Sequence, residues 1–258
     1  MSTDPVVIVA ARRTPIGAFQ GAFSDVSATE LGATAIAAAV ADSGVDPADF
    51  SRALMGCVLP AGLGQAPARQ AALGGGLPKG VPCVTVNKMC GSGMESLVMA
   101  HDMVVAGSVS IAVAGGLESM TNAPYLMPKA RRGYRMGHQE VLDHMFYDGL
   151  QDIYEGHMMG HFAEATSQKY GFTREDQDAF AIESVTRATR AAGDGSFDAE
   201  IVPVTVKTRK GEHTVSVDEV PGTVSIEKIP NLRPAFARDG TVTAASSSSI
   251  SDGAAALV

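Results

Sequence analysis

The stretch Val86-Asn87-Lys88-Met89-Cys90-Gly91-Ser92-Gly93 decides how the rest of the chain is interpreted. It follows a short apolar run, Val81–Val86, that is typical of a buried strand, and apolar residues recur at helical spacing from Met94 onward. We therefore expect Cys90 at a strand-to-helix turn. A helix N-terminus carries partial positive charge and free N–H groups, which favour a thiolate over a thiol. Cys90 is thus a candidate nucleophile, and the alternative is a small hydrophobic residue of the core.

Strand-like and helix-like patterns alternate through the first 118 residues. Besides Val81–Val86, the apolar runs that predict buried strands are Val6–Ala11, Ala53–Leu59 and Ser110–Ala114. A capping box, Ser27–Glu30, predicts a helix that ends near Ser43. This alternation predicts an α/β fold with a mostly parallel sheet covered by helices. Ligands of such sheets bind outside the carboxyl ends of the strands, which is where Cys90 would lie.

The regular alternation is lost after Gly116. Residues 119–243 are predicted to form an inserted, irregular α+β domain between the segments 1–118 and 244–258 of the first domain. The insertion contains a helix that starts at the capping box Thr173–Asp176 and a β-hairpin around Gly211. The last residues, Ala254–Val258, predict the start of a strand that belongs to the first domain.

Composition limits the class of protein. The chain has 258 residues, of which 45% are apolar, so it can form a sizeable core. A formal charge of −8 argues against nucleic-acid binding, and the sequence shows neither a bilayer-spanning apolar run nor a secretory leader. The cysteines Cys57, Cys83 and Cys90 form no C-x-x-C pair. This odd number without a leader predicts a cytoplasmic protein, and we interpret Cys57 and Cys83 as core residues.

Other polar residues have ordinary interpretations beside functional ones. A basic loop in this acidic chain is either a solvated surface or a region that attracts a polyanionic ligand, and its residues are Lys129, Arg131, Arg132, Arg135 and His138. The serines Ser246–Ser249 form either a polar turn or a set of hydrogen-bonding groups near a ligand. His157 and His161 are four residues apart but lack the glutamate of a metalloprotease helix, so no metal site is predicted.

Several motifs in order resemble the thiolase family from Val6 to the last residue. Three of them are the segment around Cys90, Gly115-Gly116-Leu117-Glu118-Ser119-Met120 and Asp252-Gly253-Ala254-Ala255-Ala256. Further matching segments are Ala11–Gly17, Gly64–Gln70, Asn122–Tyr125, Ala163–Glu164, Glu175–Asp178 and Leu232–Phe236. The resemblance implies that Cys90 is acylated during the reaction, that Ser248 contacts the pantetheine arm of coenzyme A and that Met158 lines the same channel.

The resemblance also implies functions for the domains and partners. Residues 119–243 would be the family's loop domain, which holds coenzyme A and helps to build dimers or tetramers. The ligands would be acyl-coenzyme A and coenzyme A, used as substrates, with no resident cofactor and no membrane. The family's Asn-Glu-Ala-Phe segment, Gly-His-Pro histidine and second catalytic cysteine do not occur in this sequence. We therefore expect an N-terminal portion that is inactive or nearly so alone and is completed by a further chain or segment.

Three functions remain open from the sequence. The first is acyl transfer through a Cys90 thioester, either by condensation and cleavage of acetoacetyl-coenzyme A or on a broader range of 3-ketoacyl chains. The second is a non-catalytic assembly protein that keeps the fold for binding. The third is a decarboxylating condensing enzyme of the ketoacyl-synthase type, which the Gly-Ser-Gly context after Cys90 disfavours.

Overall fold

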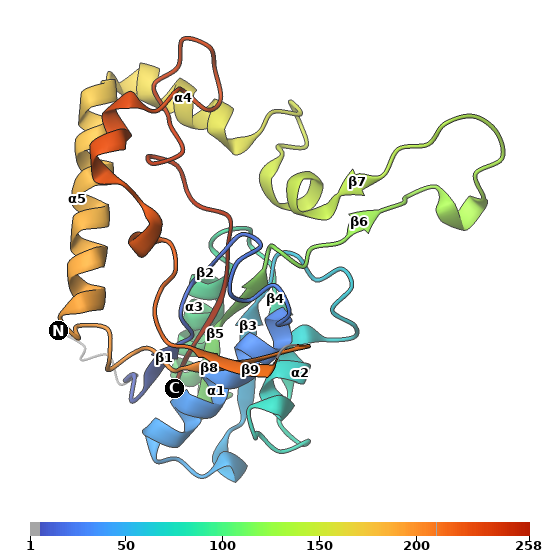
Figure 1. Ribbon diagram of the computed structural model, residues 1–258. Helices are drawn as coiled ribbons and strands as arrows, with labels where there is room; N and C mark the ends of the chain where they lie inside the picture. The colour runs from blue at the N-terminus through green and yellow to red at the C-terminus, as the bar shows by residue number, and fades with distance from the viewer. Residues whose placement is uncertain (1–5, 210) are drawn as a thin grey trace. The chain divides into compact units, whose positions relative to one another are not determined.

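The computed structural model describes residues 6–209 and 211–258, which form two compact units (Figure 1). The first unit comprises the chain up to Ala123, Asp198–Val217 and Ser251–Val258. The second comprises Pro124–Phe197 and Asp218–Ile250. The sequence predicts residues 198–217 inside the insertion, whereas their contacts group them with the first unit. The domain boundaries 1–118, 119–243 and 244–258 stay a prediction.

Among the described residues, a mixed six-stranded sheet forms the centre of the first unit. The strand order is β1-β10-β5-β3-β4, and β2 also pairs with β10. Since only β10 is antiparallel to its neighbours, the other five strands point the same way. The predicted α/β class with a mostly parallel sheet is confirmed. The strands are β1 (Ala11–Arg13), β2 (Gly17–Ala18), β3 (Arg52–Gly56), β4 (Cys83–Val86), β5 (Ala112–Ser119) and β10 (Ser251–Leu257).

Three helices cover the two faces of this sheet: α1 (Ala28–Ser43), α2 (Pro67–Gly74) and α3 (Ser92–Val105). Alternate residues of β5 show the division, because side chains along a strand point to opposite faces. Val113 and Leu117 belong to the core beneath α1 and α2, whereas Ala114 packs with α3. Even-numbered residues of β5 therefore face α3, which is the side on which Cys90 lies.

The predicted helix start at Ser27 is confirmed. The N–H of Glu30 donates to the Ser27 hydroxyl at 3.2 Å, and the N–H of Ser27 donates to the Glu30 carboxylate at 2.8 Å. The helix ends at Gly44, whose φ of 67° suits glycine. The apolar residues of this helix that face the core are buried, among them Leu31, Ala35, Ile36, Ala39 and Val40.

The prediction of a buried strand over Val6–Ala11 is wrong. Regular pairing starts only at Ala11, which lies opposite Leu257 of β10. Before it, the N–H of Val9 donates to the carbonyl oxygen of Val258 at 2.8 Å. The described residues provide no further partner strand for Val7 and Ile8, whose exposed fractions are 71% and 57%.

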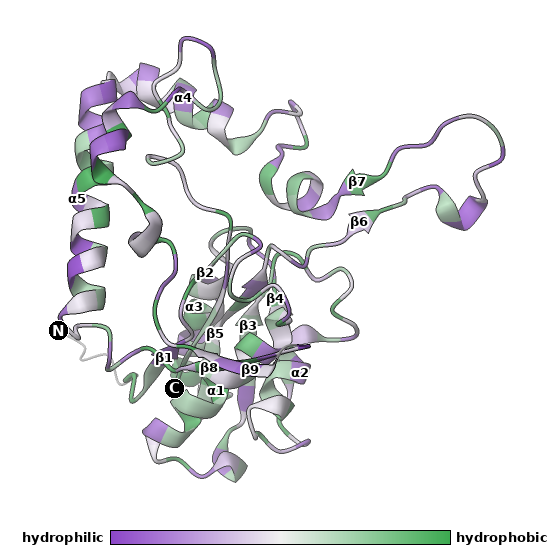
Figure 2. Ribbon diagram, in the orientation of Figure 1, coloured by the Kyte–Doolittle hydropathy of each residue, from purple (hydrophilic) through white to green (hydrophobic). Residues whose placement is uncertain are grey.

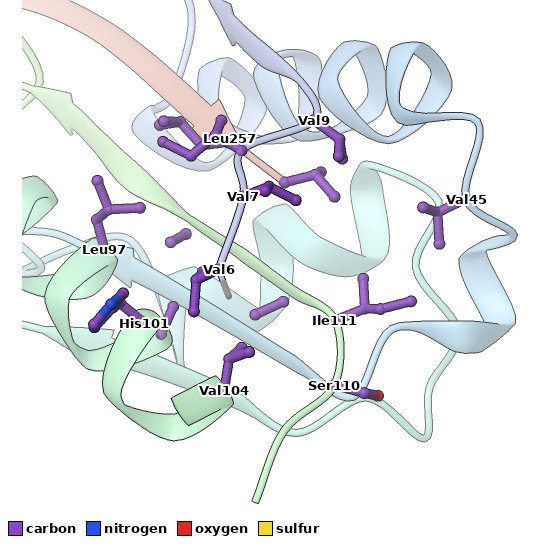
Figure 3. Close-up of a pocket in the computed structure, with 15 residues that line it drawn as sticks. Val6, Val7, Val9, Val45, Leu97, His101, Val104, Ser110, Ile111 and Leu257 are labelled. Carbon is purple, nitrogen blue, oxygen red and sulfur yellow. The ribbon is translucent and has the colours of Figure 1, made fainter. Parts of the chain in front are cut away.

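An apolar hollow of about 310 Å³ lies between this N-terminal run and α3 (Figure 3). Its walls include Val6, Val7, Leu97, Val104 and Leu257. The outer side of α3 is apolar too, since Met94, Val98 and Val105 are 73%, 52% and 57% exposed. A helix that is apolar on both its inner and outer sides is characteristic of a buried helix.

The second unit contains the helices α4 (Met159–Tyr170) and α5 (Arg174–Gly193) and a short hairpin of β6 (Tyr125–Leu126) and β7 (Leu142–Asp143). A six-residue π-helix, Met145–Leu150, follows β7. The capping box of Thr173 and Asp176 is present as predicted at the start of α5. Figure 2 shows long hydrophilic stretches on α5, whereas α1 in the first unit is coloured mostly on the hydrophobic side of the scale.

Buried polar contacts fix the irregular segments of the second unit. The carboxylate of Glu164 on α4 accepts hydrogen bonds from the N–H groups of Thr241 and Val242 at 2.9 Å each. The guanidinium of Arg174 pairs with Asp178 at 2.8 Å and donates to the carbonyl oxygen of Leu232 at 2.8 Å. These contacts hold chain segments that lack regular secondary structure.

The predicted hairpin around Gly211 is also present, as β8 (Val204–Thr208) and β9 (Gly211–Val215). Val204 and Val206 are buried and join the core of the first unit. No helix within residues 6–209 and 211–258 combines the length and the apolar character that crossing a bilayer requires.

Candidate active site

Cys90 lies on the turn between β4 and α3, where the sequence pattern predicts it, and it is exposed. Met89, the residue before it, has a φ of 49°, which non-glycine residues seldom adopt outside sharp turns and functional sites. The side-chain oxygen of Asn87 accepts a hydrogen bond from the Met89 N–H at 3.0 Å. The chain thus reverses sharply at the position that carries the thiol.

The buried hydroxyl of Ser92 holds the two ends of this turn together. It accepts a hydrogen bond from the N–H of Lys88 at 2.8 Å and donates one to the carbonyl oxygen of Met89 at 2.5 Å. Main-chain bonds add to it, because the Ser92 N–H also donates to the Met89 carbonyl, at 2.9 Å. Cys90 lies inside this closed turn, directly before the first turn of α3.

Glycines allow the start of α3 to lie directly on the sheet backbone. A Cβ atom built on Gly56, the last residue of β3, would be 2.6 Å from the Ser92 carbonyl carbon and 2.7 Å from the Gly93 nitrogen. Gly93 also lies close to Gly116 of β5, because a Cβ built on Gly116 would be 3.5 Å from the Gly93 Cα. The position of the Cys90 turn is therefore fixed by backbone-to-backbone contact with two strands.

Cys90 borders a pocket of about 350 Å³ at the carboxyl ends of β3 and β5. Most of its lining is glycine, alanine or apolar, and the apolar side chains are Ile16, Val58, Met89 and Leu117. Two charged residues also line it, Arg13 and Glu118. Arg13 is paired with Glu200 at 2.6 Å. Such a pocket can take a small apolar group beside a reactive thiol.

The other two cysteines have different environments. Cys57 is 1% exposed, and burial together with the negative charge of Glu118 raises the pKa of its thiol to about 12. Cys83 is half-buried, and burial raises its pKa as well, although Arg69 opposes the shift. The core prediction is therefore confirmed for Cys57, whereas Cys83 is only half-buried. Cys90 is the exposed cysteine of the three.

Met158 and Ser248, the residues predicted to contact coenzyme A, belong to the second unit. Met158 is half-buried, precedes the first residue of α4 and pairs with Gln151 in an isolated bridge. Ser248 is exposed in the serine segment that follows Thr243. The rings of His157 and His161 stack with their centroids 4.1 Å apart. Contact of Met158 and Ser248 with coenzyme A stays a prediction.

Reasoning from the sequence missed the residues that surround the thiol. Arg13 and Glu118 lie within segments quoted for the family resemblance, but nothing in those segments indicated that both line the Cys90 pocket. Gly56 lies within the apolar run Ala53–Leu59, and nothing in that run indicated its contact with the start of α3. The pair Gly115-Gly116 directly after the predicted strand Ser110–Ala114 was the available hint, because glycines in a strand often mark close backbone approach.

Comparison with known proteins identifies the family. Residues 6–258 match the model of the thiolase N-terminal domain, so the chain belongs to the thiolase family. It is 50% identical over 255 residues to a probable acetyl-CoA acyltransferase of Staphylococcus aureus strain COL and 49% identical to that of strain bovine RF122 / ET3-1. In both cases the match covers 98% of this chain and 65% of the relative, so the chain spans about two thirds of the length of these relatives.

The structure comparison agrees. The fold is similar to the crystal structure of the Acat5 thiolase from Ascaris suum in complex with coenzyme A, with a TM-score of 0.90 and 40% sequence identity. The match covers 97% of this chain and 64% of that one. The predicted thiolase-like fold is thereby confirmed.

Proposed function

We propose that the chain supplies the nucleophile of an acyl-coenzyme A acyltransferase and that Cys90 carries the acyl group as a thioester. The observation that carries the proposal is the exposed Cys90 thiol on a closed turn before α3, facing a pocket with small and apolar walls, in a chain of the thiolase family. An exposed thiol at a helix N-terminus is suited to nucleophilic catalysis, whereas a buried thiol such as Cys57 is not.

The proposed chemistry has two steps. The Cys90 sulfur attacks the thioester carbonyl of an acyl-coenzyme A or the 3-keto carbonyl of a 3-ketoacyl-coenzyme A. A new carbon–sulfur bond forms, and the bond that breaks is the carbon–sulfur bond of the acyl-coenzyme A or the C2–C3 bond of the 3-ketoacyl chain, after which the leaving group takes up a proton. The leaving group is coenzyme A from an acyl-coenzyme A, or the enolate of acetyl-coenzyme A from a 3-ketoacyl substrate. The enzyme thioester then passes its acyl group to coenzyme A or to the α-carbon of acetyl-coenzyme A. We assign the Cys90 backbone N–H as one donor to the oxyanion.

Acetoacetyl-coenzyme A is the substrate we favour, and a broader range of 3-ketoacyl chains is the alternative. Coenzyme A would act as a substrate, with Met158 and Ser248 along its pantetheine arm. The basic loop of residues 129–138 would attract its phosphates, since Lys129, Arg131 and Arg135 are all exposed. The homologous thiolase from Ascaris suum was solved with coenzyme A, which supports this ligand class.

The base and the second cysteine of the reaction would come from residues beyond those of this chain. About a third of the length of these relatives lies outside the matched region. The apolar outer side of α3 is suited to be covered by that remainder. A homo-oligomer, either a dimer or a tetramer, is proposed from the β6–β7 hairpin, because Tyr125, Met127 and Met136 expose 67%, 52% and 91% of their surface.

The cytoplasm is the compartment we propose, because a free cysteine nucleophile requires reducing conditions and all three cysteines are free. A second candidate function is a non-catalytic assembly partner, which the exposed apolar side of α3 favours. The family match argues against the third alternative, a decarboxylating condensing enzyme.

Intact-mass measurement after incubation with acetyl-coenzyme A or acetoacetyl-coenzyme A tests the proposal. The expected result is the addition of one acetyl group per chain, located at Cys90 by peptide mapping and absent in Cys90→Ala. Repeating the reaction with the separately produced C-terminal remainder of a Staphylococcus relative is expected to raise the rate. A wild-type chain that stays unmodified both with and without that remainder would favour the assembly function.

A further inference from the structure

The carboxylate of Glu118 connects the end of β5 to the loop that follows β3. Its two oxygens accept hydrogen bonds from the N–H groups of Val58 at 2.7 Å and Leu59 at 3.0 Å. The Cys57 thiol also donates to it, at 3.6 Å. Charge-assisted hydrogen bonds of this kind are stronger than those between neutral groups. The carboxylate therefore fixes three consecutive residues, 57–59, just after the last paired residue of β3.

The strand register brings Glu118 to this position. Gly56 lies opposite Gly116 in the parallel pair of β3 and β5, so Glu118 lies two residues beyond the last pair. Side chains alternate along a strand, so Glu118 and Gly116 point to the same face, the one covered by α3. The N–H of Cys57 donates to the Val86 carbonyl at 2.9 Å and extends the ladder with β4 by one bond. After that bond, the next two backbone N–H groups, those of Val58 and Leu59, donate to the Glu118 carboxylate.

Val58 is the part of this loop that reaches the thiol pocket. Its side chain is half-buried and lines the same pocket as Cys90 and Glu118. On either side of it, Cys57 and Leu59 are 1% and 4% exposed and belong to the interior. The loop is therefore anchored by buried side chains on both sides and by the Glu118 carboxylate at its backbone, and this fixes where the Val58 wall stands.

We infer that Glu118 is a positioning residue that holds Val58 as a wall of the Cys90 pocket and thereby limits the size of the group that can bind beside the thiol. The inference rests on the proposed function, because the group in question is the acyl chain. Glu118 and Val58 would together determine which acyl chains the pocket accepts. Both oxygens of Glu118 are engaged by the Val58–Leu59 backbone. That geometry fits orientation of the loop.

Thiol reagents of different bulk test the wall without depending on acyl-transfer activity. We would measure the rates at which Cys90 reacts with N-ethylmaleimide and N-cyclohexylmaleimide, each divided by the rate with glutathione. In the wild-type chain the bulky reagent is expected to be slower by about tenfold, since a few misplaced carbon atoms in an apolar pocket cost that much. Iodoacetamide serves as the small reference reagent.

The variant Glu118→Gln keeps the shape but points an amide donor at one of the backbone N–H groups. We expect this variant to lose most of the tenfold discrimination, which is the ratio of the N-ethylmaleimide rate to the N-cyclohexylmaleimide rate. Its rate with iodoacetamide should stay within about twofold of wild type, because the bonds of Ser92 around Cys90 are unchanged. The matched control is Glu212→Gln on the exposed strand β9, which is expected to keep the full discrimination. Unchanged discrimination in Glu118→Gln would overturn the inference.

A second pair of variants decides the case in which Glu118→Gln loosens the whole fold and makes Cys57 reactive. Val58→Ala is expected to lower the discrimination and Val58→Leu to raise it, because they move the wall without touching the carboxylate. If neither changes the ratio, Val58 is no wall and the inference fails. Acylation by acetyl- and hexanoyl-coenzyme A is measured in parallel. Absence of acylation in a wild-type chain that still discriminates between the maleimides would count against the proposed function and not against the wall.

Discussion

The hydroxyl of Ser92 donates a hydrogen bond to the carbonyl oxygen of Met89 across the turn that carries Cys90, at a distance of 2.5 Å. The Ser92 hydroxyl oxygen also accepts a hydrogen bond from the N–H of Lys88, so one side chain bonds to both arms of the turn. Met89 is held at a φ of 49° by these bonds. The turn that exposes the candidate nucleophile therefore depends on a residue that contributes no chemistry of its own.

Replacement of Ser92 by alanine is expected to lower the stability of the chain by about 1–2 kcal/mol, because the N–H of Lys88 loses its acceptor and the Met89 carbonyl loses a donor. The rate of Cys90 acylation by acetyl-coenzyme A should fall by about tenfold or more, since a misplaced nucleophile loses its alignment. Urea denaturation and intact-mass kinetics measure the two effects. Ser216→Ala, at an exposed position after β9, is the matched control and should leave both unchanged.

Gly56→Ala tests whether the sheet positions the thiol. The new methyl group would meet the Ser92 carbonyl carbon at 2.6 Å, which is backbone and cannot rotate away. We expect a loss of about 1–3 kcal/mol of stability together with a displaced start of α3. The rate of Cys90 acylation should fall by more than the loss of folded chain alone explains.

Gly80→Ala is the control for this prediction, because a Cβ at Gly80 meets no atom within 4 Å and its φ is not in the left-handed region. It should behave like wild type in denaturation and in acylation. Equal acylation rates for Gly56→Ala and wild type would show that the backbone contact with β3 does not set the position of Cys90.

Local signals in the sequence predicted the helices better than the strand ends. Ser27 and Thr173 each begin a helix with a capping box, because the capping hydrogen bonds are made within a few residues. The run Val6–Ala11 looks like a buried strand, but burial depends on partners elsewhere in the chain. β10 provides regular pairing only from Ala11, so Val7, Ile8 and Val9 remain exposed.

The position of Cys90 could be predicted from the sequence, whereas the residues that line the pocket around it could not. The strand, the turn and the helix around Cys90 follow from residues that are close in sequence. Arg13, Val58 and Glu118 come to the same pocket from three different elements, and the parallel register of β3 with β5 decides which of them meet. Register depends on long-range pairing, so a single sequence gives little information about it.

The exposed apolar side of α3 gives a prediction about association. In Val98→Lys/Val105→Lys, two residues that are 52% and 57% exposed become charged, so we expect weaker binding of a hydrophobic dye and less self-association of the chain. Dye fluorescence and light scattering after size-exclusion chromatography measure these effects. The control Asp102→Lys adds a positive charge at an exposed polar position of the same helix. If both variants behave alike, net charge is responsible and the apolar surface is not.

Cys57 predicts how stability depends on alkaline pH. Burial beside Glu118 raises the pKa of its thiol from 9.0 to about 12, so the folded chain keeps this proton to higher pH than the unfolded chain. The contribution of the protonated thiol is therefore complete below pH 9 and is lost as the pH rises from 9 towards 12. One such group weakens stability by at most about 1.4 kcal/mol per pH unit within that window.

The measurement is urea denaturation of the wild-type chain and of Cys57→Ala at several pH values between 8 and 11. Other groups titrate in the same range, so the difference between the two chains isolates the thiol. We expect wild type to lose stability faster than the variant above pH 9, because the variant has no proton to lose at this position. Parallel curves would mean that Cys57 ionises alike in the folded and unfolded chains, and that the Glu118 carboxylate does not act on it as the 3.6 Å contact indicates.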